Sequence, residues 1–83
     1  MESYRIVIKK SAAKEIEKKD RIRIIEKIRS LAHDPHPVGS KKLSGQEKYR
    51  IRQGSYRILY QVINEEIVIY VVKVGHRKDI YQN

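Results

Sequence analysis

Apolar and polar residues alternate at the beginning of the chain, and the spacing then becomes helical. Residues 3–9 (SYRIVIK) alternate as a half-buried strand does. Ser11 and Asp20 are residue types that cap helix N-termini. Each is followed by apolar residues whose spacing places them on one side of a helix. In the second of these segments the apolar residues follow the i, i+3, i+4, i+7 rule, at Ile24, Ile25, Ile28, Leu31 and Ala32. The pattern predicts a strand and two helices in a hairpin, ended by the prolines of DPHP.

Period two returns after the loop of residues 34–46 and predicts three further strands. The segments KYRIR (48–52) and YRILYQVI (56–63) flank the turn QGS, where Gly54 is free to adopt a positive φ angle. The segment IVIYVVKV (67–74) is almost continuously apolar, which is typical of a strand at the centre of a sheet.

We therefore expect an α+β fold with an N-terminal strand, a helical hairpin and a three-stranded antiparallel meander. Together these elements form one mostly antiparallel sheet with two helices on one face. A chain of 83 residues has room for one such sheet and one helical layer, so residues 1–83 are expected to form a single domain.

The balance of charge narrows the class of partner. Nineteen Lys and Arg residues face ten Asp and Glu residues, which gives a formal net charge of +9. A field of this sign attracts polyanions such as nucleic acid, an anionic membrane or an acidic protein segment. The chain has no cysteine, its three histidines are scattered, and its longest apolar run is far shorter than the roughly 20 residues of a membrane span. We expect a cytoplasmic protein with no metal, no cofactor and no membrane partner.

Three arginines interrupt the apolar pattern of the first predicted hairpin. Arg50 and Arg52 lie on one face of their strand, opposite the apolar face that the helices need to cover. If the turn residues are Gln53 and Gly54, Arg50 pairs directly across from Arg57. Like charges in that position are destabilising unless water screens them or an anion sits between them. The fixed fork of a guanidinium suits phosphate, which favours the second interpretation.

The tail, VGHRKDIYQN, adds an imidazole, another guanidinium and a phenol to these arginines. Gly75 allows the chain to bend, and His76, Arg77 and Tyr81 follow it. We expect a cleft in which basic groups contact phosphates and an aromatic ring stacks on a base. Asp79 has no carboxylate neighbour in this segment, which disfavours metal-dependent phosphoryl chemistry.

The strings YRIRQGSYRILYQV and VGHRKDIY, preceded by a basic helical hairpin, resemble the RelE/ParE superfamily of toxins from bacterial and archaeal toxin–antitoxin pairs. The resemblance covers nearly the whole chain, and the VGHR…Y ending favours the RelE branch. It implies an mRNA endonuclease that cuts in the ribosomal A site by metal-free attack of the RNA's own 2′-hydroxyl. It also implies an acidic RelB-like antitoxin as partner. The alternatives are ParE-like inhibition of DNA gyrase without nuclease activity, and an inactive nucleic-acid-binding relic.

The resemblance implies a role for most of the basic residues. Arg50 and Arg52 match two basic residues, one of which acts as base or holds the reacting phosphate, and Arg57 matches the arginine that stabilises charge on that phosphate. Arg77 matches the residue proposed to protonate the leaving oxygen, and Tyr81 matches the tail tyrosine that stacks on or orients the nucleotide. Three lysines are candidates for contact with RNA or the ribosome: Lys41, Lys42 and Lys48.

The chain departs from the best-known RelE pattern at Arg50 and Arg52. Those two positions are lysines there, and a desolvated lysine is able to lose its proton and act as a base. Arginine, whose pKa is above about 12, effectively cannot. Either these arginines only stabilise the pentacoordinate phosphate electrostatically, or the base is another group, for which His76 is the candidate because imidazole titrates near neutral pH. The alternative is that these residues have structural roles. Arg50 and Arg52 would then be edge-strand charges that prevent aggregation, and His76 would be a turn residue.

Overall fold

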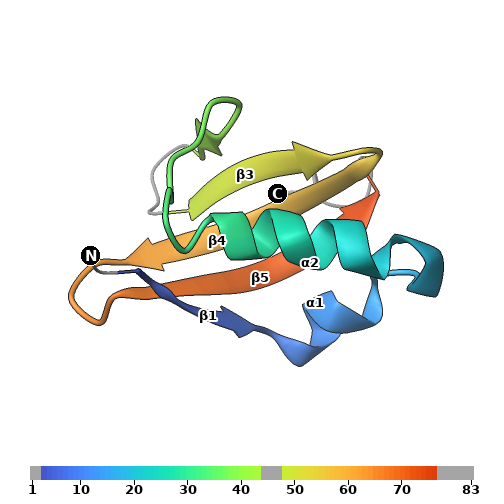
Figure 1. Ribbon diagram of the computed structural model, residues 1–83, viewed down its shortest axis with the longest axis horizontal. Coiled ribbons are helices and arrows are strands. Elements are labelled where there is room, and N and C mark those ends of the chain that lie inside the picture. Colours follow the sequence, from blue (N-terminus) through green and yellow to red (C-terminus); the bar gives the residue numbers. More distant parts are fainter. Residues whose placement is uncertain (1–2, 44–47, 77–83) are drawn as a thin grey trace.

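The computed structural model describes residues 3–43 and 48–76 of the chain, so the predictions for Arg77 and Tyr81 lie outside the described residues. The elements follow the expected order of strand, two helices and meander (Figure 1), and the α+β class is confirmed. In chain order they are β1 (Arg5–Ile8), α1 (Lys10–Lys14), the 3₁₀ helix η1 (Lys18–Asp20), α2 (Arg21–Ser30), β2 (Lys41–Lys42), β3 (Lys48–Gln53), β4 (Tyr56–Ile63) and β5 (Val68–His76).

The five strands form one sheet in the order β1-β5-β4-β3-β2. β1 pairs in parallel with β5, whereas β3, β4 and β5 pair antiparallel and form the predicted meander. β5 therefore lies between β1 and β4, inside the sheet, as its almost continuously apolar sequence predicts.

The loop expected at residues 34–46 contains a short strand that the hydrophobic pattern does not predict. Lys41 and Lys42 of β2 pair with Arg50 and Tyr49 of β3. Two consecutive exposed lysines show no alternation and have low strand propensity, so this strand depends on tertiary pairing alone. Charged side chains on an outer strand also discourage pairing with the edge of another sheet.

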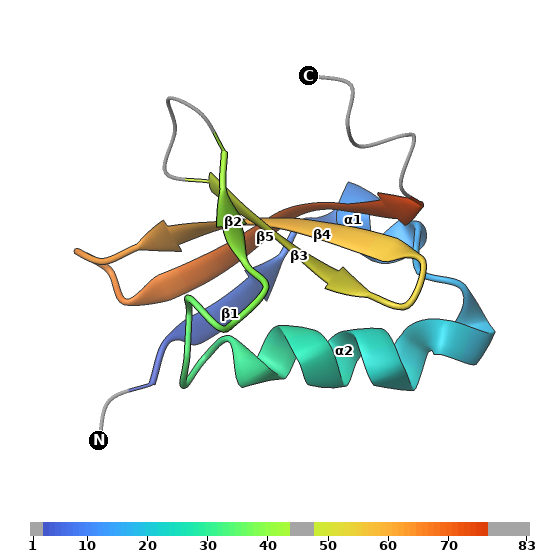
Figure 2. The same cartoon turned by 90° about the horizontal axis from the view of Figure 1, so that it is seen from above.

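α2 covers one face of the sheet because its apolar residues repeat on one side. Ile24, Ile28 and Leu31 are fully buried against the strands, and Figure 2 shows α2 running beneath the sheet. Burying a side chain of this size contributes roughly 1.5–3 kcal/mol. Ala12 of α1 joins the same core. None of the helices in the described ranges is long and apolar enough to cross a membrane.

Neither predicted helix cap forms. Ser11 lies inside α1, whose N-cap residue is Lys9 and makes no side-chain hydrogen bond. Asp20 occupies the N-cap of α2 but makes no cap bond, and its carboxylate instead accepts a hydrogen bond from the Tyr56 hydroxyl at 3.1 Å. A tertiary contact therefore replaces local capping and ties the beginning of α2 to β4.

Candidate nucleic-acid interface

The register of β3 and β4 decides which arginines face each other. The turn between these strands consists of Gly54 and Ser55, and Gly54 has a φ of +62°, in the left-handed region that favours glycine. Arg52 therefore lies directly across from Arg57. The prediction that Arg50 pairs with Arg57 is wrong because it placed the turn one residue too early, and moving the turn by one residue shifts each pairing by two.

Arg52 and Arg57 project from the open face of the sheet, by which we mean the face opposite α2. The neighbouring pair in the register, Ile51 and Ile58, is buried under α2, and side chains alternate along a strand. Arg52 is exposed, whereas Arg57 is only 7% exposed and is the one buried charged side chain of the described residues.

The buried guanidinium has a defined environment. A buried charge is stable only when it is paired or hydrogen-bonded. Within residues 3–43 and 48–76, none of the buried side-chain nitrogen or oxygen atoms lacks a hydrogen-bond partner. Arg57 makes an interaction of this kind, whereas Arg52 opposite it is exposed.

One hollow at the end of the sheet brings three predicted site residues together. It is lined by Arg52, Arg57 and His76, together with the turn residues Gly54 and Ser55. Its volume is about 400 Å³, within the range of roughly 300–1,000 Å³ that is typical of small-ligand sites. No carboxylate is among the described residues that line it, and the two guanidiniums suit an anion such as a phosphate group. Across the described part of the chain, no group of three or more His, Asp or Glu side chains is arranged to hold a metal ion.

His76 reaches this hollow in an orientation that the sequence does not predict. The pairing of β4 with β5 shifts between Leu59 and Tyr60, and Val72 is an extra residue on β5. The bulge reverses the alternation beyond it, so His76 pairs with Tyr56 and shares the α2 side of the sheet on which Tyr56 is buried. His76 therefore borders the hollow from the α2 side at the end of the sheet, whereas Arg52 and Arg57 border it from the open face. The ring centroids of His76 and Tyr56 are 4.5 Å apart, with an angle of 34° between the planes.

Tyr56 is held at its hydroxyl end as well. The hydroxyl donates a hydrogen bond to Asp20 Oδ2 at 3.1 Å and accepts one from the backbone amide of Glu17 at 3.2 Å. Burial is the main cause that raises the pKa of this phenol above its ordinary value, and the nearby carboxylate of Asp20 raises it further. The phenol therefore stays neutral near pH 7 and connects the helical layer to the ring of His76. The sequence does not single out Tyr56, because its partners lie more than 30 positions away in the chain.

A second row of residues crosses the open face beside the arginine pair. Lys41 pairs with Arg50, Arg50 pairs with Leu59, and Leu59 pairs with Lys73. Two predicted site residues, Lys41 and Arg50, are thus neighbours in this row. Lys73 was not predicted, because its strand reads as continuously apolar and the hydrophobic pattern gives no signal of the bulge.

The other two predicted lysines lie apart from each other. Lys48 lies on the open face at the end of β3 that is far from the hollow. Lys42 pairs with Tyr49, whose ring stacks on that of the buried Tyr60 with centroids 5.7 Å apart. Lys42 therefore projects from the side of the sheet opposite to Arg50.

Comparisons with known proteins identify the family to which the chain is related. The family model described as the ParE toxin of the type II toxin–antitoxin system parDE matches residues 6–81. A protein of Escherichia coli named as a RelE-like toxin is 34% identical over 94% of this chain and 90% of its own length. The mRNA interferase toxin RelE of Escherichia coli K12 is 45% identical over a shorter stretch, which is 37% of this chain and 33% of that protein.

Solved structures show the same fold. The isolated RelE toxin of Escherichia coli aligns with a TM-score of 0.76 and 26% identity, over 95% of this chain and 92% of its own. The toxin of the archaeal RelE–RelB complex of Pyrococcus horikoshii aligns with a TM-score of 0.76 and 30% identity, over 92% of this chain and 97% of its own.

The sheet order and the basic open face, taken with these likenesses, define a toxin of the RelE/ParE superfamily. Within it, the chain belongs to the family of ParE toxins of type II toxin–antitoxin systems, in the RelE-like branch.

Proposed function

We propose that this toxin is a ribosome-dependent mRNA endonuclease that cuts the codon in the A site and so inhibits translation. The observation that carries the proposal is the hollow at the end of the sheet that Arg52, Arg57 and His76 line. The partial likeness to a protein named as an mRNA interferase supports RNA as the substrate. Such an enzyme acts where mRNA is translated, so the proposed location is the cytoplasm.

The proposed chemistry is a phosphodiester transfer that needs no metal. The 2′-hydroxyl oxygen forms a bond to the adjacent phosphorus while its proton passes to a base. The bond between phosphorus and the 5′-oxygen breaks, and that oxygen takes a proton from an acid. The products are a 2′,3′-cyclic phosphate and a 5′-hydroxyl, so no water, oxidant or reductant is consumed.

The proposed roles follow from what each side chain is able to do. Arg52 and Arg57 stabilise the negative charge that develops on the phosphate oxygens, a task for preorganised cations. Arginine does not release its proton at neutral pH, so neither of them is the base. His76 accepts the proton of the 2′-hydroxyl, because neutral imidazole is a base at pH 7. The contact of its ring with Tyr56, which limits the orientation of the imidazole, supports this role.

Further site residues enter the proposal through the family resemblance. Arg50 contributes positive charge beside the arginine pair, Arg77 protonates the leaving oxygen, and Tyr81 stacks on or orients the nucleotide. Arg77 and Tyr81 lie outside the described residues. Contact with the RNA or the ribosome is assigned to Lys41, Lys42 and Lys48.

The proposed partner in the resting state is an acidic RelB-like antitoxin. The similar archaeal toxin was solved as a complex with RelB. A formal charge of +9 on this chain favours an acidic, extended segment that neutralises the open face.

A defined mRNA tests the proposal when it is incubated with the purified protein in two forms. One is naked, and the other is bound to ribosomes that carry an empty A site. Primer extension is expected to show a stop within the A-site codon only in the ribosomal sample. Cleavage of the naked RNA would contradict ribosome dependence. If neither form is cleaved, the nuclease assignment is contradicted.

The family match favours one other candidate function. The matching model describes ParE toxins, and a ParE-like protein inhibits DNA gyrase without cutting RNA. A gyrase supercoiling assay with the same protein separates the two functions. Inhibition of supercoiling without RNA cleavage would favour the ParE-like function, and neither activity would indicate an inactive binding protein.

A further inference from the structure

The bulge in β5 determines the direction in which one lysine points. Leu59 pairs with Lys73, but the next residue of β4 pairs with Val71, so Val72 is an extra residue. Strict alternation from the buried Val71 would turn Lys73 toward α2. The bulge instead places Lys73 on the open face, where it is exposed, and turns Val74 into the core, where it is 1% exposed.

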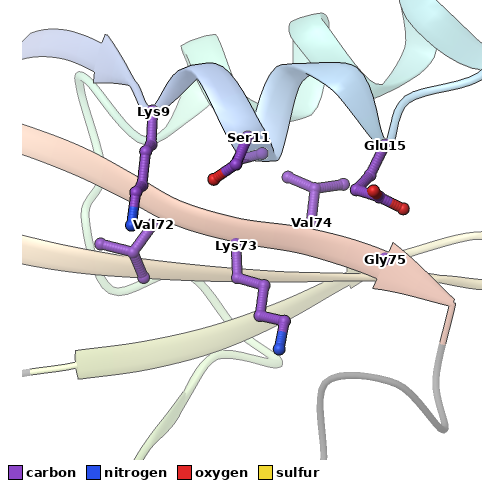
Figure 3. Close-up of a pocket in the computed structure, with 8 residues that line it drawn as sticks. Lys9, Ser11, Glu15, Val72, Lys73, Val74 and Gly75 are labelled. Carbon is purple, nitrogen blue, oxygen red and sulfur yellow. The ribbon is translucent and has the colours of Figure 1, made fainter.

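The close-up of the region between α1 and β5 shows the resulting orientation (Figure 3). Lys73 extends from β5 away from α1, whereas Val74 points toward α1. Glu15, the acidic residue at the end of α1, lies on the α1 side of the strand. The ammonium group of Lys73 is thus directed toward the open face and away from the helix that carries the nearby carboxylate.

Lys73 ends a row that crosses four strands. The order in the register is Lys41, Arg50, Leu59 and Lys73. Neighbouring strands lie about 4.8 Å apart, so the backbones of Arg50 and Lys73 are separated by roughly 10 Å, with the half-buried Leu59 between them. The row of Arg52 lies two residues further along the strands, which is about 7 Å away.

We propose that Lys73 binds a backbone phosphate of single-stranded RNA, next to the phosphate held between Arg52 and Arg57. This inference rests on the proposed function and extends its substrate contact to a second nucleotide. An ammonium group binds phosphate as a point charge without demanding a fixed geometry. Leu59 lies between the cations Arg50 and Lys73 in the row. This order matches the alternation of phosphates and rings along a nucleic-acid strand, with Leu59 under a base or ribose.

The test compares three variants with the wild-type protein in the ribosomal cleavage assay. Lys73→Gln removes the charge, Lys73→Arg keeps it, and Lys14→Gln removes an equal charge from an exposed position on α1. Because Lys73 is exposed, Lys73→Gln is expected to fold, which circular dichroism and the melting temperature verify. We expect Lys73→Gln to raise KM about 10-fold with kcat nearly unchanged, the signature of a lost binding contact. Lys73→Arg is expected to restore KM, and Lys14→Gln to behave as wild type.

Salt dependence provides a second readout that does not require cleavage. Binding of a single-stranded RNA oligonucleotide is followed by fluorescence anisotropy over a range of KCl concentrations. Loss of one phosphate contact is expected to reduce the slope of log Kd against log salt by about 0.7 for Lys73→Gln, and not for Lys14→Gln.

The outcomes separate the two proposals. If the wild-type protein does not cleave but the RNA-binding slope changes as expected, the nuclease function fails and the phosphate contact stands. If the wild-type protein cleaves and Lys73→Gln matches Lys14→Gln in both readouts, the Lys73 contact is overturned alone. It is also overturned if Lys73→Gln weakens binding of an acidic antitoxin peptide and leaves RNA binding and cleavage unchanged.

Discussion

Arg52 and Arg57 lie directly opposite each other on neighbouring strands, and Arg57 is buried. Like charges directly across a strand pair destabilise a sheet, with pair energies of roughly 0.2–1 kcal/mol. An anion placed between the two guanidiniums would turn this repulsion into attraction. The same pair therefore lowers the stability of the free protein and favours the proposed binding of phosphate. A substitution that relieves the repulsion is expected to raise stability and to weaken phosphate binding.

Replacing Arg52 with glutamine is expected to stabilise the free protein. The substitution relieves the repulsion at Arg57 and leaves a long polar side chain at an exposed position. We expect the free energy of unfolding to rise by about 0.5 kcal/mol, which for a domain of this size raises the melting temperature by roughly 2–4 °C. Thermal unfolding followed by circular dichroism at low ionic strength measures the change.

Lys14 provides the matched control for this substitution. It lies at an exposed position on α1, so Lys14→Gln removes the same charge without relieving a like-charge pair across two strands. We expect Lys14→Gln to give a smaller rise than Arg52→Gln. Equal shifts in the two variants would show that net charge, and not the opposed arginines, sets the effect.

A polyanion is expected to stabilise the wild-type protein through the open face. Any ligand that binds only the folded state raises its stability, by about 2.7 kcal/mol at a concentration 100-fold above Kd. We expect a short single-stranded RNA, or an acidic antitoxin peptide, to raise the melting temperature of the wild-type protein more than that of Arg52→Gln. The effect is expected to shrink at high salt. An unchanged melting temperature with saturating ligand would argue against this face as the neutralised site.

Tyr60 is expected to make the stability of the core sensitive to alkaline pH. Its hydroxyl donates a hydrogen bond to the carbonyl oxygen of Pro35 at 2.7 Å, and burial raises its pKa from 10.0 to about 12. The folded state then keeps a proton that the unfolded chain has lost. The contribution of Tyr60 is thus complete below pH 10 and is lost as the pH rises toward 12, which amounts to roughly 2–3 kcal/mol.

Urea unfolding of the wild-type protein and of Tyr60→Phe at pH 8 and pH 11 measures this contribution. At pH 8 we expect the wild-type protein to be more stable by about 1 kcal/mol, because the variant loses a hydrogen bond. At pH 11 the difference is expected to shrink or to change sign. A difference that is the same at both pH values would show that the phenol does not titrate as described.

His76 is expected to make a large contribution to the rate of cleavage. His76→Ala removes the proposed base and is expected to cleave about 10²–10⁴-fold more slowly than the wild-type protein. Single-turnover rates on programmed ribosomes provide the measurement. An unchanged rate in His76→Ala would assign the base to another group.

Tyr56→Leu distinguishes positioning from chemistry at the same histidine. Leucine removes the ring against which His76 packs and the hydroxyl that bonds to Asp20. We expect this variant to cleave more slowly than the wild-type protein but faster than His76→Ala, because the imidazole is still present. Tyr56→Phe keeps the ring and is expected to retain most of the rate. Equal losses in the two variants would show that the hydroxyl, and not the ring, determines the position of His76.

Much of the fold follows from the sequence because its signals are local. The spacing of Ile24, Ile28 and Leu31 predicts α2, and the alternation of residues 48–52 and 56–63 predicts the hairpin of β3 and β4. The strand β2 escapes prediction because its two lysines carry no pattern, and their pairing depends on β3.

The candidate site is less predictable, because two single-residue features determine it. The turn at Gly54 and Ser55 places Arg52, and not Arg50, opposite Arg57. The extra residue in β5 then turns Lys73 to the open face and His76 toward Tyr56. Periodicity alone cannot locate a turn to one residue or reveal a bulge. The sequence therefore predicts which residues belong to the candidate site better than it predicts which residues face each other.

The hollow at Arg52 is proposed to act on RNA in the ribosomal A site, and removal of the Arg52 guanidinium tests this role. Cleavage of ribosome-bound mRNA is followed by primer extension for the wild-type protein, Arg52→Gln and the charge-matched control Lys14→Gln. We expect Arg52→Gln to be at least as stable as the wild-type protein and to cleave about 10²-fold more slowly, with Lys14→Gln unaffected. An Arg52→Gln protein that cleaves at the wild-type rate would contradict a role of this hollow in RNA cleavage.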